Sequence, residues 1–441
     1  YRLSNQTSSV IDTLYLNLPD FTSYDEVHWN GQQVHPSWVD LPLNLQTLAL
    51  KIPAETNGIL KIKGSRIHTG FTQDKHTQQP EITFNGSFLH AQDLLPTLGY
   101  KQDNELQENR YRSDWGLEKI DSRMSAISNP IALTEDVFSP DATWLSGTIE
   151  LSTSADQVAV APGKLIKSWQ AEDRNHYRYH LDSPAPFEWY IGSAQYQQVS
   201  FNHDGIQSHI YFKPEHDYNI SFFKKSVENA LTFIQSSLGN YPYPEFKLIE
   251  IPYYQEPHYA YPNTIAISEK EGWYADTTSL QNQVYIEFTI ASNLLGHWVM
   301  QNIPIANVQG ANMLRHALPE SMAMQIIEDQ YGQEGIEWLL TKKQGLYARE
   351  RGTEPNVEPP LIKADGIAYL ESNKGTIELY RLSRLMGQEA FIQTIKDWAE
   401  GLNENATFFD LYSMLLKDEA IANIPKEEIQ IVKKAFEEVT L

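Results

Sequence analysis

The sequence predicts an α+β protein of more than one domain: an antiparallel, sandwich-like β domain over residues 1–212, then a mainly α-helical domain over residues 213–441. Three observations lead to this prediction. The chain of 441 residues is too long for one ordinary core. Its first half consists of short runs rich in Val, Ile, Thr, Tyr and Phe, separated by Gly, Pro, Asn and Asp. Its second half repeats apolar residues at helical spacing.

Four runs in the first half have a clear strand composition. They are residues 13–18, 60–64, 147–152 and 177–181. Each is rich in β-branched or aromatic residues, which favour strands. Residues 98–140 are polar and charged instead, and we expect them to form a loop that crosses the sheet surface.

A helical period begins at Ile220 and continues to Ile234. A short β segment follows at residues 247–251, and residues 352–360 are a Pro- and Glu-rich loop. Further helices are predicted at residues 280–303, 311–331, 336–349, 374–386, 390–402, 407–416 and 426–439.

Composition excludes several classes of function. The chain carries 34 Lys+Arg against 57 Asp+Glu, and its formal charge of -23 would repel nucleic acid, so no nucleic-acid partner is expected. It has no cysteine, which excludes disulfides, thiolate metal sites and a cysteine nucleophile. The most apolar helical stretch, residues 284–300, contains Glu287, Asn293 and His297 and is too polar to span a membrane. A soluble fragment is therefore expected, and its start at Tyr1 indicates a piece excised from a longer chain.

Seven short segments follow one another in the order and spacing of a known family. They are FNGSF (84–88), PTLGY (96–100), DQVAVAPG (156–163), PNTIAISE (262–269), NVQGANML (307–314), EDQYG (328–332) and NKG (373–375). In these segments the chain resembles the aminopeptidase N family of gluzincin metallopeptidases, most closely the branch fused to bacterial ABC-2 type permeases. The resemblance covers nearly the whole chain. It implies that the helical domain is thermolysin-like.

The residues that would bind zinc in this family are replaced. A helix of such enzymes carries HExxH, because residues four apart share a helical face and can aim two imidazoles at one ion. The matching stretch, SNLLGHW, has Ser292 and Gly296 at the two ligand positions and Asn293 at the position of the general base. Continuing the alignment places His316 at the third ligand and Ser372 at the tyrosine that would stabilise the oxyanion. The resemblance therefore implies no intact catalytic residue and no zinc cofactor.

The resemblance also locates a binding cleft beside the PNTI segment. Its predicted residues are Glu256, Tyr259, Tyr261, Pro262, Asn263 and Thr264. Glu256 is a candidate to replace the family's glutamate that binds the free amino terminus of a substrate. The tyrosines could stack on an extended peptide, or they could pack against the neighbouring loop.

Two residues of the motif helix have alternative explanations. A glycine in a helix costs about 1 kcal/mol relative to alanine, so Gly296 is either the remnant of a lost histidine or the site of a close helix crossing. His297 lies about 100° of helix rotation from Gly296, and we expect it to point away from the former metal site.

The leading hypothesis is a catalytically inactive, aminopeptidase-like extramembrane domain of a bacterial inner-membrane protein of the ABC transport type. It would bind a peptide or protein in the vestigial cleft and adjoin the membrane-embedded remainder of its parent chain. The alternative is an active zinc metallopeptidase with an unorthodox site built from His297, His316, Glu320 and Glu287. A purely structural role is the third possibility. The ending FEEVTL resembles a junction after which a C-terminal β domain follows in related proteins. The ligand, the membrane side and the oligomeric state are not predictable from the sequence.

Overall fold

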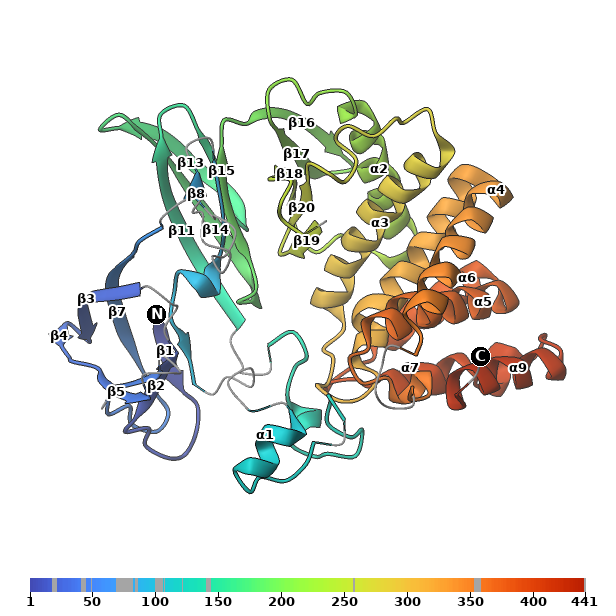
Figure 1. Ribbon diagram of the computed structural model, residues 1–441, viewed down its shortest axis with the longest axis horizontal. Helices are drawn as coiled ribbons and strands as arrows, with labels where there is room; N and C mark the ends of the chain where they lie inside the picture. Colours follow the sequence, from blue (N-terminus) through green and yellow to red (C-terminus); the bar gives the residue numbers. More distant parts are fainter. Residues whose placement is uncertain are drawn as a thin grey trace.

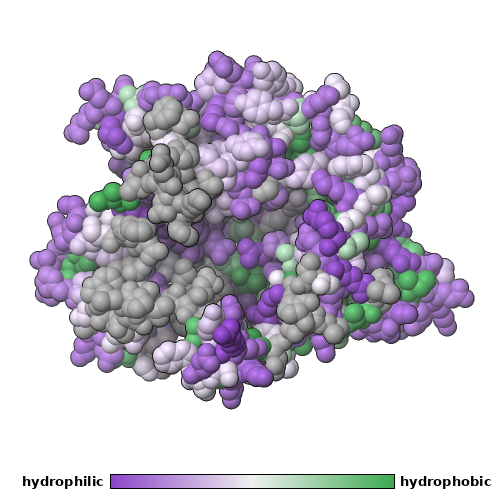
Figure 2. All heavy atoms as spheres, in the orientation of Figure 1, coloured by the Kyte–Doolittle hydropathy of each residue, from purple (hydrophilic) through white to green (hydrophobic). Residues whose placement is uncertain are grey.

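The computed structural model describes residues 1–17, 22–40, 45–48, 50–68, 82–83, 86–99, 106, 108–120, 122–139, 144–256, 258–352 and 358–439. In these residues strands dominate the N-terminal half and helices the C-terminal half (Figure 1). The predicted α+β fold class is therefore confirmed. Figure 2 shows hydrophilic side chains over most of one face, as expected for a chain with a formal charge of -23.

The N-terminal half contains small sheets. One sheet has the order β1 (Arg2–Asn5), β7 (Thr56–Arg66), β3 (Thr22–Trp29) and β4 (Gln32–Gln33), and another has β10 (Thr97–Leu98), β2 (Leu14–Asn17), β6 (Leu45–Leu48) and β5 (Ser37–Asp40). A three-stranded sheet has the order β11 (Trp144–Ser154), β14 (Arg174–Pro186) and β13 (Lys164–Ala171). A further sheet has β12 (Val158–Val160), β15 (Tyr190–Ala194), β9 (Gly86–His90) and β8 (Ile82–Thr83). All of these strands pair antiparallel. Three of the strand patterns found in the sequence fall within β7, β11 and β14, and the pattern at residues 13–18 includes β2, with residue 18 outside the described residues.

A five-stranded mixed sheet lies between these small sheets and the helices (Figure 1). Its order is β16 (Gln197–His203), β17 (Ile206–Phe212), β18 (Glu245–Ile251), β20 (Thr264–Ser268) and β19 (His258–Tyr261). β17, β18 and β20 run parallel, whereas β16 and β19 are antiparallel edge strands. Every residue of β18 is buried, as is usual for a strand covered on both faces. The sheet contains strands from both sides of the boundary predicted after residue 212, so the division into domains stays a prediction.

Helices form the C-terminal half. Those described are α2 (Ile220–Phe233), α3 (Leu280–Asn302), α4 (Leu318–Glu350), α5 (Thr376–Met386), α6 (Gln388–Glu400), α7 (Phe408–Leu415), α8 (Asp418–Ile421) and α9 (Lys426–Glu437), with short turns η1 (Ala91–Asp93), η3 (Ala132–Thr134) and η6 (Leu361–Lys363). Three π-helical segments precede or extend them: η4 (Ile234–Leu238), η5 (Met313–Ala317) and η7 (Leu370–Gly375). α4 is interrupted at Gly332, whose φ of 62° is not helical, where the sequence predicts the end of one helix and the start of another. Within the described ranges, no helix is both long and apolar enough to cross a membrane.

The segment expected to cross the sheet surface packs elsewhere. Residues 100–105, 107, 121 and 140 lie outside the described residues. The described remainder includes the short helix α1 (Asn109–Asp114). Bridges join Ser125 to Val308 and Asp136 to Ala306, so this stretch packs against the helical half. The expectation was wrong because apolar partners of the segment lie in the connection between α3 and α4, far away in the sequence.

Residues 353–357 of the predicted loop at 352–360 also lie outside the described residues, as do 84–85 of FNGSF, Tyr100 of PTLGY and the last two residues of the predicted junction.

A buried polar junction connects the β half to the five-stranded sheet. The side chain of Asn263 accepts a hydrogen bond from Gly163 N at 2.9 Å and donates to the backbone oxygens of Gly163 and Glu245, both at 3.1 Å. Lys247 donates from its ammonium to Gly163 O and lies 3.4 Å from the Glu245 carboxylate. Burial lowers the pKa of Lys247 to about 8 although Glu245 opposes the shift. Gly163 has φ +86°, and a Cβ there would lie 2.4 Å from His180 O, so only glycine fits.

Substitutions at Asn263 test this junction. We expect Asn263→Ala to lower the free energy of unfolding by about 3 kcal/mol, because three buried hydrogen bonds are lost and alanine is strained at φ 51°. Asn263→Gly loses the same bonds but tolerates the positive φ, and should cost about 1 kcal/mol less. Urea denaturation measures both values. Equal losses, or losses below about 0.5 kcal/mol, would contradict this account.

Candidate functional site

A pocket of about 270 Å³ lies where α3, the turn before α4 and strand β19 meet. Its lining includes Ser292, Asn293 and Gly296 from α3 and His316 from η5. These are the positions that the family motif assigns to two zinc ligands, the general base and the third ligand. The structure therefore brings all four around one cavity. The remaining lining residues are Phe138, His258, Ala260, His297, Met300, Arg315, Pro319 and Glu320.

The helical period explains how α3 presents its part of the pocket. Ser292 and Gly296 are four residues apart, so they share a face with Asn293 beside them. Both polar side chains bond to their own helix: Ser292 Oγ donates to Thr289 O at 3.2 Å and Asn293 Nδ2 to the same oxygen at 2.7 Å. These donors are thus satisfied without any ion or partner from another element.

Gly296 is not explained by a close helix crossing. A Cβ built on this residue would meet no heavy atom within 4 Å, apart from the atoms of its own helix backbone and chain neighbours. The space beside it belongs to the pocket. The packing therefore does not support a close helix crossing, and the loss of a larger side chain stays a prediction.

His297 contributes to the lining of the pocket, and its ring contacts aromatic residues of the core. It is fully buried, and its Nδ1 lies 2.9 Å from Tyr241 Oη. The imidazole also packs against Tyr243 and Phe246, with ring centroids 5.9 and 6.4 Å away. Burial lowers the pKa of His297 to about 4, and its ring is therefore neutral at physiological pH.

Two other imidazoles, His258 and His316, open into the pocket. Both residues line the concave pocket and remain exposed to solvent. Partial desolvation there lowers the pKa of both, and Arg315 and His258 lower that of His316 further. For His258 the nearby Glu320 acts in the opposite direction. Both rings are therefore neutral near pH 7 and can donate or accept hydrogen bonds.

The carboxylate in the pocket is already neutralised. Glu320 Oε2 accepts a hydrogen bond from Lys343 Nζ at 2.7 Å and from Thr376 Oγ1 at 2.7 Å. The same ammonium donates to Ser372 O at 2.7 Å, and the Lys343 side chain is only 7% exposed. Ser372, the position aligned with the oxyanion donor, does not itself line the pocket. A buried lysine thus links Glu320 to the segment that would hold the oxyanion donor.

The residues at the assigned positions do not fit the zinc ion that the sequence resemblance implies. Protein zinc sites use three or four N, S or O ligands at about 2.0–2.3 Å. Ser292, Asn293 and Gly296 offer no imidazole or carboxylate, which leaves His316 as the one ligand among the assigned positions. Glu287, named in the alternative site, is instead bonded by Asn229 at 2.6 Å and Tyr331 at 2.5 Å.

The predicted cleft residues are not part of this pocket, and the cleft beside the PNTI segment stays a prediction. None of Glu256, Tyr259, Tyr261, Pro262, Asn263 and Thr264 lines the pocket. Side chains alternate along β19, so His258 and Ala260 face the pocket while Tyr259 and Tyr261 face the opposite way. Tyr259 packs 4.5 Å from Tyr190, and Tyr261 is fully buried.

The other predicted cleft residues have structural positions or lie at the surface. Pro262, Asn263 and Thr264 are buried in the turn from β19 to β20, and Glu256 is exposed before β19. Sequence reasoning missed His258, Ala260, Arg315 and Lys343 at the site. The alternation of aromatic residues in HYAY was the available signal for the first two. No local signal marked Lys343, which reaches the site from the second half of α4.

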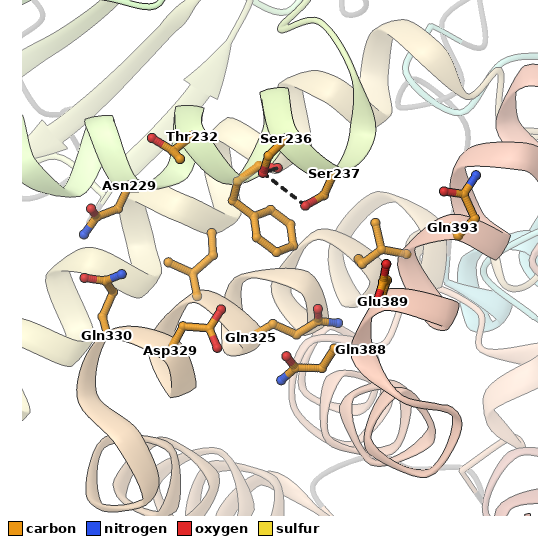
Figure 3. A pocket seen from close by; sticks show the side chains of 13 residues that line it. Asn229, Thr232, Ser236, Ser237, Gln325, Asp329, Gln330, Gln388, Glu389 and Gln393 are labelled. Atoms are coloured by element: carbon orange, nitrogen blue, oxygen red, sulfur yellow. Dashed lines mark hydrogen bonds between the residues drawn. The ribbon is translucent and has the colours of Figure 1, made fainter.

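A second, larger pocket of about 500 Å³ lies between α2 with η4, α4 and α6. Figure 3 shows Gln325 and Gln388 on the side opposite Ser236 and Ser237. Its lining is rich in amides and hydroxyls. It contains none of the positions aligned with zinc ligands, the general base or the oxyanion donor. The first pocket therefore remains the candidate functional site.

Comparisons with solved structures show a shared fold. An M1 zinc metallopeptidase from Deinococcus radiodurans matches with a TM-score of 0.63 and 12% identity over 100% of this chain and 89% of its own. A mutant M1 zinc metallopeptidase from the same organism, bound to a Tyr-Ser-Ala substrate, matches with a TM-score of 0.61 and 12% identity over the same shares. Legionella pneumophila aminopeptidase A in complex with aspartic acid matches with a TM-score of 0.66 and 12% identity over 98% of this chain and 46% of its own. No family model and no curated protein sequence matches. At this identity the likeness establishes the fold alone.

Gly296→Ala should stabilise the protein. Alanine favours the helix by about 1 kcal/mol relative to glycine, and the added methyl group meets no neighbour. Gly375→Ala is the matched control at a helical glycine, because its Cβ would lie 2.6 Å from Met313 Sδ and should destabilise the fold. Thermal and urea unfolding of the two variants measure the contrast. A loss of stability in Gly296→Ala would restore the helix-crossing explanation.

His297 should make stability fall on acidification. Its folded pKa of about 4 lies below the ordinary value of 6.5, so the unfolded chain binds the proton first as pH falls. The contribution is complete above pH 6.5 and is lost progressively towards pH 4, by up to about 3 kcal/mol. We expect His297→Gln to flatten this part of the profile, measured by urea unfolding between pH 7 and 4.

His203→Gln is the control for this profile, because that imidazole is partly exposed and hydrogen-bonded to Thr232 at 2.8 Å. It should retain the acid dependence of the unmodified protein. Identical profiles for His297→Gln and the unmodified protein would show that His297 is not a source of acid sensitivity.

Proposed function

We propose that this chain is a catalytically inactive, peptide- or protein-binding domain built on the zinc aminopeptidase fold. The observation that carries the proposal is the pocket between α3, η5 and β19, which is open although its assigned positions hold Ser292, Asn293, Gly296 and His316. A scaffold without a ligand would gain stability by closing such a cavity.

Hydrolysis has no supporting chemistry at these positions. A zinc peptidase lowers the pKa of a bound water to about 7 and uses a carboxylate as general base. Asn293 is an amide that cannot take up a proton at neutral pH. Glu320 is the one carboxylate among the described lining residues, and Lys343 and Thr376 already bond to it.

The pocket is suited to one side chain or one chain terminus. Its volume of about 270 Å³ is below the range of roughly 300–1,000 Å³ typical of sites for drug-sized ligands. Phe138, Met300 and Pro319 offer apolar contact, and the neutral imidazoles of His258 and His316 offer hydrogen bonds. A peptide segment can insert one residue here while the rest lies along the surface.

The wider context of the proposal comes from the sequence resemblance. On that resemblance we propose that the chain is an extramembrane domain of a bacterial inner-membrane protein of the ABC transport type. In that setting the domain would capture a segment of a transported or partner polypeptide. The active metallopeptidase remains the competing hypothesis, and the same experiment tests both.

Filling the pocket should abolish binding. We expect an array of short synthetic peptides, with free and blocked termini, to contain ligands for the unmodified protein. Gly296→Phe should weaken their binding at least tenfold, about 1.4 kcal/mol, because the ring occupies the open space beside α3. Gly345→Phe is the matched control, since this exposed glycine on α4 also has no neighbour within 4 Å. Fluorescence anisotropy measures both affinities.

The competing hypothesis predicts different results. Amino-acid arylamides should not be hydrolysed with or without added Zn²⁺. Zinc-stimulated turnover that His316→Ala abolishes would overturn the proposal in favour of an enzyme. Peptide binding that is unaffected by Gly296→Phe would move the binding surface away from this pocket.

A further inference from the structure

Polar side chains gather where three parallel strands of the central sheet end. β17, β18 and β20 pair in parallel, so their carboxyl ends lie at one edge. Lys213 and His216 follow β17, Glu250 lies near the end of β18, and Glu269 follows β20. In open α/β sheets, ligands bind at this edge of the strands.

Three of these side chains have the geometry of a metal site. One ring nitrogen of His216 and one carboxylate oxygen each of Glu250 and Glu269 lie within 4.8 Å of one another. Among the residues that the structure describes, this is the one group of three or more such ligands that converges in this way. The side chains are 14%, 0% and 16% exposed, respectively, so the group is enclosed yet reachable. None of them lines the pocket at α3.

Neighbouring groups fix the orientation of the candidate ligands. The backbone N–H of Lys213 donates to Glu250 Oε2 at 2.8 Å, which leaves Oε1 directed at His216 Nδ1. The other ring nitrogen, Nε2, is hydrogen-bonded to Tyr274 Oη. Metal-bound histidines usually have such a partner on the second nitrogen, which sets the tautomer and holds the ring.

The charges of the cluster favour a divalent cation. Two carboxylates lie near each other, and the Lys213 ammonium pairs with Glu269. Burial raises the pKa of Glu250, and the nearby charge of Glu269 adds to the increase. A divalent ion would balance both carboxylates at once. The Lys213 side chain is 27% exposed and can turn to solvent when the ion enters.

We propose that His216, Glu250 and Glu269 form a binding site for a divalent transition metal, for which Zn²⁺ matches the donor set of one imidazole and two carboxylates. Three protein ligands leave one position for water. The ion would tie the segment after β17 to the ends of β18 and β20, and so stabilise the central sheet. This inference does not depend on the proposed peptide binding.

Calorimetric titration of chelator-treated protein with ZnCl₂ tests the site. We expect one Zn²⁺ per chain and a rise in melting temperature. His216→Ala and Glu269→Gln should each lower the affinity at least tenfold. Lys213→Gln should raise the Zn²⁺ affinity about tenfold, because the competing ammonium is removed. If the cluster served only as a set of ion pairs, this variant would show no such gain. His203→Ala and Glu337→Gln, a histidine and a glutamate outside the cluster, are the matched controls.

Several outcomes would overturn the proposal. One is the absence of one-to-one binding, and another is binding that survives the combination of His216→Ala with Glu269→Gln. A third is loss of binding in His316→Gln, which would place the ion in the pocket at α3. Circular dichroism establishes that each variant is folded. If a variant unfolds, X-ray absorption of the zinc-loaded unmodified protein decides, because the site requires one imidazole nitrogen with oxygen ligands and no second histidine.

Discussion

The buried polar junction around Gly163 determines how the two halves of the chain meet. Asn263 bonds to both the N–H and the carbonyl of Gly163, and Lys247 adds its ammonium to the same carbonyl. Because Asn263 begins the turn between β19 and β20, it also sets the position of β19. His258 and Ala260 on that strand form one wall of the pocket at α3. The site therefore rests on bonds made on the other side of the sheet.

Lysine side chains balance the charge of carboxylates at two places inside this protein. At the pocket, Lys343 compensates Glu320 and reaches across to the segment of Ser372. At the strand ends, Lys213 pairs with Glu269 beside the buried Glu250. Removing the 7% exposed Lys343 would leave Glu320 as an uncompensated charge, whereas Lys213 is 27% exposed and can turn to solvent. The two places differ in the ligands nearby, since imidazole and two carboxylates converge only at the strand ends within the described part of the chain.

Local patterns predicted the elements well and the long-range arrangement less well. The helical period gave α3 to within a residue at its end, and the break in α4 at Gly332 was foreseen from apolar spacing. The parallel pairing of β17, β18 and β20 was not predicted, because the signal for a short buried strand does not specify its partners. For the same reason His216, Glu250 and Glu269 gave no motif: they meet only through that pairing. The motif positions on α3 were found because a helix brings residues four apart together without help from the rest of the fold.

The π-helical segments have a consequence for protein engineering. Single π turns insert an additional residue into a helix and occur frequently at functional sites. Here η5 carries His316 and η7 carries Ser372, the two positions that the sequence resemblance aligns with a metal ligand and an oxyanion donor. Rebuilding backbone is the hardest step in installing a new active centre, whereas side chains on rigid elements can be exchanged. Attempts to install a metal centre in the pocket at α3 would therefore begin with side-chain replacement on these two segments, with the backbone left unchanged.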